Sequence, residues 1–302
     1  MSKLGLAFGG GGARGLAHLG VLKVLEQEGV EIHAITGCSM GAIVGGLYAH
    51  FKDAAQVETF LKDFLTNSEF HELGITDLSD DAETDKGYIE EFFNYVSSKV
   101  KAFMTLTNPS YLSEEITEKI FSFIPDVPIE KFDIKFSAIA TDIISGNEIN
   151  FTRGSLRNVV RASSAIPGIF PPFIIGEYHL IDGSASESVP VGKVKEIGAD
   201  RVLAVDVTRS LHSTEMPDNV FEILCRAEDI TSYHLSEIRL KEADLILRPN
   251  VKSLKWVDFH KAEMIIKAGE EVTRSNIKEI RKLVNRNSIL LDLGHFINRF
   301  SE

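Results

Sequence analysis

Short apolar runs alternate with longer amphipathic segments along the chain. The runs of strand length, which predict buried strands, are Leu4–Phe8, His33–Thr36, Ile134–Thr141 and Arg201–Val207. Residues 13–28, between the first two runs, carry apolar side chains at helical spacing and end at Gly29. Because strands alternate with helices, the pattern predicts an α/β fold whose mostly parallel sheet is covered by helices on both faces.

The same criteria predict the remaining elements. The further strands are 148–152, 173–175, 178–181 and 245–247, and the further helices are 156–162, 189–197, 221–241 and 260–284. No repeat or linker interrupts the chain, so we expect one domain over residues 1–302. Its core motifs lie within 4–207, a helical insert covers about 54–124, and a C-terminal helical extension covers about 258–302.

The pentapeptide Gly37-Cys38-Ser39-Met40-Gly41 lies between an apolar run and the helical residues 42–48. In this strand-turn-helix setting, the pattern G-x-S-x-G holds a nucleophilic serine on a strained turn. The start of the helix favours negative charge, and the amide of Met40 could help to hold an oxyanion there. The alternative is a glycine-lined turn in which Ser39 only caps the helix.

Gly9-Gly10-Gly11-Gly12-Ala13-Arg14-Gly15 follows the first strand and opens the next helix. Its amides could bind a dinucleotide pyrophosphate, since the spacing fits G-x-G-x-x-G, or they could form an oxyanion hole. A dinucleotide site needs an acidic residue near the end of the second strand, but that strand leads to Ser39. We therefore expect the amides of Gly10, Gly11 and Gly12 to lie beside Ser39.

Asp182 directly follows the apolar run that ends at Ile181. A carboxylate at this strand end could accept the proton of Ser39, and burial would raise its pKa and make it a stronger base. The alternative is a solvated turn aspartate. The rival bases are four histidines, namely His212, His234, His260 and His295. His18, near the glycine loop, is expected to be a packing or surface residue instead of a catalyst.

These motifs resemble those of the patatin-like phospholipases of bacterial type, serine acyl hydrolases that use a Ser–Asp dyad. The resemblance extends over roughly residues 4–207 and includes Ala162-Ser163-Ser164-Ala165-Ile166-Pro167-Gly168-Ile169-Phe170-Pro171-Pro172. It implies a three-layer α/β/α sandwich with Ser39 as nucleophile, Asp182 as general base and Gly10–Gly12 as oxyanion hole. The residues that would support these motifs are Arg14, Gly15, Gly37, Gly41 and Gly183.

The roles of two residues within the motifs, Arg14 and Ser184, remain open from the sequence. Arg14 could fix the glycine loop, pair with a carboxylate or meet a lipid phosphate. Ser184 stands where the family usually has Gly or Ala, and its hydroxyl could lower the basicity of Asp182. The dyad mechanism needs no metal ion and no organic cofactor.

The composition limits the kinds of molecule that this protein is expected to bind. The net charge of −12 argues against nucleic acid, and Cys38 and Cys225 form no disulfide framework or zinc pattern. With no signal peptide and no apolar run of 18 residues, we expect a cytoplasmic protein. Basic residues at 274, 278, 281, 282 and 286 indicate a packed helix, a self-association surface that would make a homo-oligomer, or peripheral docking at the inner membrane surface.

Three functions remain open from the sequence. The first is a lipid acyl hydrolase of the phospholipase A type, and the second is a carboxylesterase or thioesterase for soluble acyl esters. The third is a non-catalytic module that binds anions or lipids. The residues between 64 and 123 are rich in aromatics that form core or line an acyl channel, and the acidic residues 77–85 predict a surface loop in preference to a calcium site.

Overall fold

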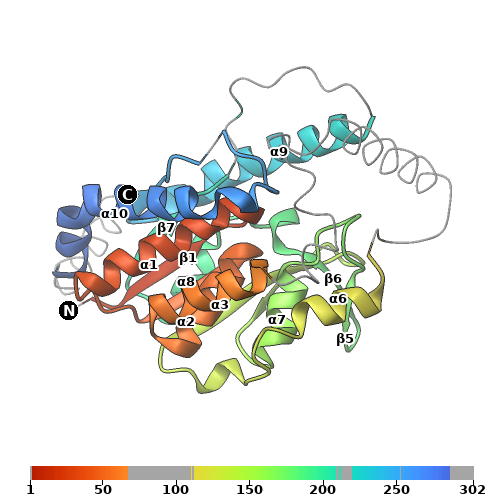
Figure 1. Cartoon of the computed structure of the whole chain (residues 1–302), viewed down its shortest axis with the longest axis horizontal. Helices are drawn as coiled ribbons and strands as arrows, with labels where there is room; N and C mark the ends of the chain where they lie inside the picture. The colour runs from red at the N-terminus through yellow and green to blue at the C-terminus, as the bar shows by residue number, and fades with distance from the viewer. Residues whose placement is uncertain are drawn as a thin grey trace, which may run out of the picture.

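A sheet of eight strands lies at the centre of the computed structural model, which describes residues 2–66, 110, 112–208, 211, 220–251 and 253–285 (Figure 1). Its parallel strands are β1 (Leu4–Phe8), β2 (Ala34–Cys38), β3 (Lys135–Asp142), β7 (Arg201–Val205) and β8 (Leu245–Leu247). Two strands, β4 (Glu148–Phe151) and β6 (Tyr178–Asp182), pair antiparallel with β3, and β5 (Phe173–Ile175) pairs antiparallel with β6. The order is β5-β6-β3-β2-β1-β7-β8, with β4 paired to β3.

Helices cover both faces of this sheet, as expected for a three-layer α/β/α sandwich. One face packs against α1 (Ala17–Gln27), α2 (Met40–Phe51), α7 (Leu156–Ser163) and α10 (Ala262–Asn285). On the same side lie α3 (Ala54–Thr66) and α6 (Glu114–Phe121). The other face packs against α8 (Val191–Glu196) and the 3-10 turn Leu240–Glu242 that follows α9 (Val220–Arg239).

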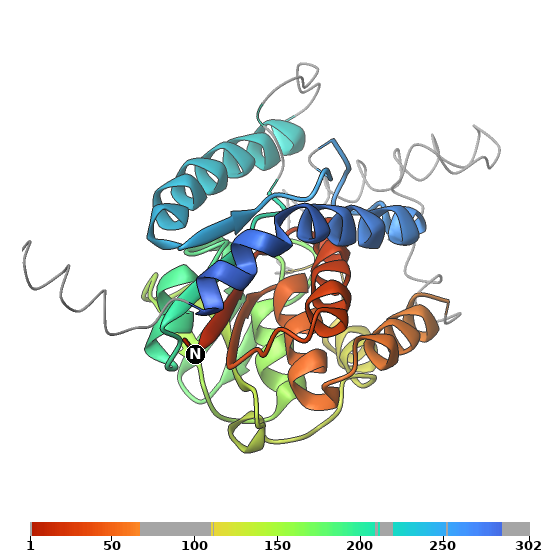
Figure 2. The same cartoon turned by 90° about the vertical axis from the view of Figure 1, so that its left-hand side faces the viewer.

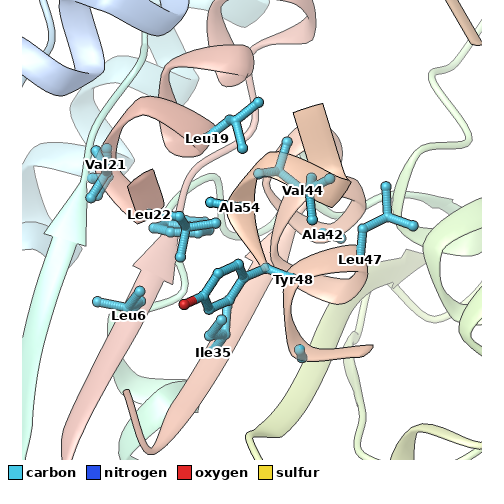
Figure 3. Packing of buried hydrophobic residues seen from close by; sticks show 14 of the residues in the cluster. Leu6, Leu19, Val21, Leu22, Ile35, Ala42, Val44, Leu47, Tyr48 and Ala54 are labelled. Atoms are coloured by element: carbon cyan, nitrogen blue, oxygen red, sulfur yellow. The ribbon is translucent and has the colours of Figure 1, made fainter. Parts of the chain in front are cut away.

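Alternation along the strands separates the two layers of core. Leu6 and Phe8 on β1 belong to the large cluster under α1 and α2, whereas Ala7 between them belongs to the cluster under α8. Figure 3 shows Leu6 and Ile35 of the sheet packed against side chains of α1 and α2, including Leu22 and Tyr48. The large residues point to the face with more helices, so this layer holds most of the buried apolar surface.

The helices α1 and α10 cross at unusually close range, and Figure 2 shows them side by side. Gly20 and Gly269 lie at the crossing. A Cβ at Gly20 would overlap the carbonyl oxygen of Ile266, and one at Gly269 would overlap that of Ala17. Glycine is therefore required at both positions for this contact.

Most predicted elements are confirmed within one to three residues, and one differs more. The helix expected from residue 13 starts with the 3-10 turn Gly12–Leu16, because Gly12 has φ 56° and the Ala13 amide donates to the carbonyl of Trp256. The second strand extends two residues further than expected, to Cys38. Much of the predicted insert at 54–124 and the end of the predicted extension lie outside the described residues. No described helix is long and apolar enough to cross a membrane.

Candidate active site

Ser39 lies at the sharp turn between β2 and α2. Its backbone has φ 51° and ψ −123°, a strained conformation for a residue with a side chain, and its side chain makes no capping hydrogen bond. The interpretation of Ser39 as a simple helix cap is therefore wrong. Gly37 and Gly41 permit the turn, since a Cβ at Gly37 would overlap Ala42, and one at Gly41 would overlap the carbonyl oxygen of Phe8.

Asp182 ends β6 and is only 2% exposed, which contradicts the alternative of a solvated turn aspartate. The sheet register brings it close to Ser39: Cys38 pairs with Ile139 on β3, and the next residue, Ala140, pairs with Asp182. Ser39 follows β2 and Asp182 ends β6, and only β3 lies between these two strands. Both residues therefore lie at the same level along β3.

The surroundings of the Asp182 carboxyl act on its pKa in opposite directions. Burial raises the pKa. Hydrogen bonds lower it, from the backbone amide of Ser184 at 2.9 Å and from the side chains of Ser39 and Ser184. The Cys38 thiol, 3.7 Å from Oδ1, also donates, and burial raises the pKa of this thiol well above its usual range. The net pKa of Asp182 is raised, and the Ser184 side chain opposes that rise, as the sequence suggested.

The glycine loop lies beside Ser39, as expected. A Cβ at Gly10 would be only 3.4 Å from the Cβ of Ser39. The Gly10 amide, however, donates to the carbonyl of Ser188 at 3.0 Å, so it is already engaged in a backbone hydrogen bond. Within the described part of the chain, no backbone carbonyl accepts from the amides of Gly11, Gly12 or Met40. Of the four amides expected to form an oxyanion hole, Gly10 alone is thus engaged by a backbone carbonyl among the described residues.

Side chains behind the loop hold it in place. The guanidinium of Arg14 is buried and donates to the carbonyl of Leu254 at 3.3 Å, which favours its loop-fixing role. The His18 Nε2 donates to the carbonyl of Gly9 at 2.8 Å, and its ring stacks on Phe8. Burial lowers the pKa of His18 to about 4, so the imidazole is neutral at pH 7 and packs, as predicted.

The other glycines of the motifs sit at close contacts. A Cβ at Gly15 would overlap the side chain of Met40, and one at Gly183 would overlap the carbonyl oxygen of Ile139. Substitution at either position would therefore move a neighbour of Ser39 or of Asp182.

An apolar pocket opens at Ser39. Besides Ser39, it is lined by Gly12, Met40 and Ser164 and by these apolar side chains: Leu16, Ile43, Leu61, Phe64, Leu65, Ile120, Phe121, Phe123, Ile166, Ile169, Phe170, Trp256 and Phe259. Three of the aromatics between residues 64 and 123, namely Phe64, Phe121 and Phe123, are thus in the pocket wall. The pair Phe103-Met104, which we expected to line an acyl channel or form part of a lid, lies outside the described residues. A pocket of this composition suits a hydrocarbon chain.

The described residues give no support to a histidine as the base in place of Asp182. His234 on α9 and His260 in the turn Phe259–Lys261 are exposed, and neither has a hydrogen bond to Ser39 among the described residues. His212 and His295 lie outside the described residues, as does the acidic stretch 77–85. Among the residues described, no cluster of three or more His, Cys, Asp or Glu could hold a metal ion.

Sequence reasoning missed three residues of the site. The amide of Ser39 donates to Ser163 Oγ at 3.0 Å, whereas the motif that contains Ser163 indicated no separate role for it. Trp256 and Phe259 come from a connection far along the chain, whose contact with the glycine loop no local pattern could reveal.

Two basic residues of α10, Arg274 and Arg281, contact the C-terminal end of α1. Arg274 bonds Gln27, and Arg281 pairs with Glu28, which favours the packed-helix interpretation over a docking face.

The chain is similar to several known proteins. A chain described as an uncharacterised NTE family protein of Mycobacterium tuberculosis is 30% identical over 215 residues, covering 69% of this chain and 50% of that one. Lysophospholipase NTE1 of Eremothecium gossypii is 33% identical over 207 residues, covering 68% of this chain and 12% of that one. The crystal structure of VipD from Legionella pneumophila has a TM-score of 0.49 at 13% identity, covering 92% of this chain and 67% of that one.

The chain spans half of the mycobacterial relative and about an eighth of the fungal one. The family model described as patatin-like phospholipase matches residues 6–194. Because this match takes in more than half of the chain and includes Ser39, Asp182 and the glycine loop, the protein belongs to the patatin-like phospholipase family.

Proposed function

We propose that this protein is a serine acyl hydrolase that cleaves lipid esters, of the phospholipase A type, through a Ser39–Asp182 dyad. The observation that carries the proposal is that Ser39 lines an apolar pocket while its side chain acts on the buried carboxylate of Asp182 and lowers its pKa. Family membership and a relative named as a lysophospholipase agree with it.

The first half-reaction acylates the serine. Asp182 takes the hydroxyl proton as Ser39 Oγ forms a bond to the ester carbonyl carbon, and the carbonyl oxygen becomes an oxyanion. Amides of Gly11, Gly12 and Met40 stabilise that oxyanion, a contribution worth on the order of a hundredfold in rate for one donor. The tetrahedral intermediate then collapses, and the alcohol leaves with the proton held by Asp182.

The second half-reaction releases the acid. Asp182 removes a proton from water, whose oxygen attacks the acyl carbon, and Ser39 Oγ regains a proton as the acyl-enzyme breaks down. The raised pKa of Asp182 makes it a better base than a solvated aspartate, provided that the pH keeps it ionised. The apolar wall holds the acyl chain and excludes water from its length.

Labelling with an alkyl fluorophosphonate tests the nucleophile. We expect a single adduct on Ser39 in the wild type and in the control Ser122→Ala, whose exposed hydroxyl lies on the outer side of the pocket wall. Ser39→Ala should take no label, and Asp182→Asn should lose at least about a thousandfold in kcat. Wild-type protein without an adduct would instead favour the non-catalytic binding module.

Histidine variants test the dyad against a triad. Each single His→Ala variant should keep turnover, because no histidine serves as the base. A folded but inactive His234→Ala or His260→Ala enzyme would contradict the dyad.

A substrate panel separates lipid from soluble esters. We expect phospholipid or lysophospholipid dispersions to be hydrolysed with higher kcat/KM than short monomeric esters or thioesters, since only long chains fill the apolar wall. The reverse order would favour the carboxylesterase or thioesterase function. Peripheral membrane contact, self-association and a cytoplasmic location stay predictions from the sequence.

A further inference from the structure

The turn that follows α7 touches the backbone of both dyad residues. The amide of Ser39 donates to Ser163 Oγ at 3.0 Å, and the amide of Asp182 donates to the carbonyl of Ala165 at 2.9 Å. Ser163 is fully buried and Ala165 is 2% exposed, so these bonds form away from solvent. Three consecutive residues thus connect the nucleophile to the base.

The turn is itself anchored to α7. The amide of Ser164 donates to the carbonyl of Val160 at 3.0 Å, and that of Ile166 donates to the carbonyl of Ser164 at 2.9 Å. α7 in turn packs on β3, the strand that separates β2 from β6. The turn therefore has a fixed position relative to both strands that deliver the dyad.

The bond to Ser163 acts on a strained residue. Ser39 has positive φ, and such a conformation persists only where its surroundings hold it. Removing the acceptor would leave a buried amide without a partner and let the turn relax. A shift of about 1 Å in a reacting group can cost on the order of a hundredfold in rate.

We propose that Ser163 is a positioning residue, which through its hydroxyl fixes the Ser39 turn and so sets the distance between Ser39 Oγ and the Asp182 carboxylate. The inference rests on the proposed dyad and goes beyond it, since Ser163 touches neither substrate nor reacting atoms. It gives a second physical role to the segment 162–172, which also lines the apolar pocket through Ile166, Ile169 and Phe170.

The test compares Ser163→Ala with Ser155→Ala at the other end of the same helix. Ser155 caps α7, since its Oγ accepts from the amide of Asn158, and lies away from the dyad. We expect Ser163→Ala to lower kcat and the rate of fluorophosphonate labelling at least tenfold with KM within twofold. Ser155→Ala should melt at a lower temperature but keep kcat/KM within twofold.

A pH profile separates positioning from general loss of structure. Because the Ser39 hydrogen bond lowers the pKa of Asp182, weakening that bond should move the acid limb of kcat/KM to higher pH in Ser163→Ala. Ser155→Ala should leave the acid limb where it is.

Should Ser163→Ala fail to fold, Ser163→Cys preserves the volume with a weaker acceptor, and an intermediate loss of kcat is expected. Wild-type kcat and an unmoved acid limb in the folded variant would overturn the inference. A wild-type protein that neither takes the label nor hydrolyses esters would instead overturn the proposed function, and this inference with it.

Discussion

Glycine permits close contacts in two regions of this molecule, the turn at Ser39 and the crossing of α1 with α10. At the turn, Gly41 lets α2 approach the carbonyl of Phe8, and the contact holds a strained serine. At the crossing, Gly20 and Gly269 let two ordinary helices approach each other's carbonyls. The absence of a side chain therefore supports the proposed reactivity of Ser39 in one region and the stability of the helix packing in the other.

The largest effect is expected where the contact supports chemistry. In Gly41→Ala, the new methyl group would overlap the Phe8 carbonyl and push the start of α2 away from β1. We expect kcat/KM per folded molecule to fall by at least about a hundredfold, because the Met40 amide and Ser39 move with the helix. Ester hydrolysis, normalised to folded protein by circular dichroism, measures this; unchanged kcat/KM would show that the turn tolerates displacement.

His18 on α1 lies between the two regions and should make stability depend on pH. The unfolded chain binds a proton near pH 6.5, whereas burial holds the folded pKa at about 4. The stabilisation is therefore complete above pH 6.5 and is lost as the pH falls toward 4, by about 2–3 kcal/mol. Urea unfolding between pH 7 and 4 should show a shallower loss in His18→Gln, which retains a donor for Gly9; equal slopes in the two proteins would contradict this assignment.

A substitution at the crossing of α1 and α10 should lower the free energy of unfolding without changing the activity. In Gly269→Ala the added methyl group would overlap the Ala17 carbonyl, and overpacking of this kind typically costs about 1–3 kcal/mol. Denaturant unfolding should show the loss, while kcat/KM per folded molecule stays within twofold. A comparable fall in kcat/KM would mean that the two regions are coupled through α1.

The smallest effect is expected at a helical glycine with room around it. A Cβ at Gly192 on α8 would meet nothing closer than the Glu242 carboxylate, at 3.8 Å. Gly192→Ala should therefore stabilise the protein by up to about 1 kcal/mol, through helix propensity, without changing kcat/KM. It is the matched control for both glycine contacts, and a destabilised Gly192→Ala would remove the contrast between packed and open glycines.

The sequence predicted the parts of the site that follow from local pattern. Ser39 and the glycine loop each lie at a strand-to-helix junction, and Asp182 lies at a strand end, so period and turn chemistry locate them. Parallel pairing of β1 with β2 then brings the first two together without further information.

Contacts that arise only from tertiary packing could not be predicted from the sequence pattern. The Gly10 amide donates a hydrogen bond to the carbonyl of Ser188, and the Ser39 amide donates one to the hydroxyl of Ser163. Neither partner is distinguished from other serines by its neighbours in the chain. The start of α1 was misjudged for the same reason, because a carbonyl at Trp256 draws the preceding residues into a 3-10 turn.

The loop from Leu254 to Phe259 has a practical consequence for anyone who trims this chain. A fragment cut where the family match ends, at residue 194, would retain the proposed nucleophile and base yet lose Trp256 and Phe259 from the wall of the apolar pocket, together with the carbonyls that tether Arg14 and Ala13. The smallest self-sufficient catalytic unit therefore has to reach beyond Phe259, more than sixty residues past the matched boundary.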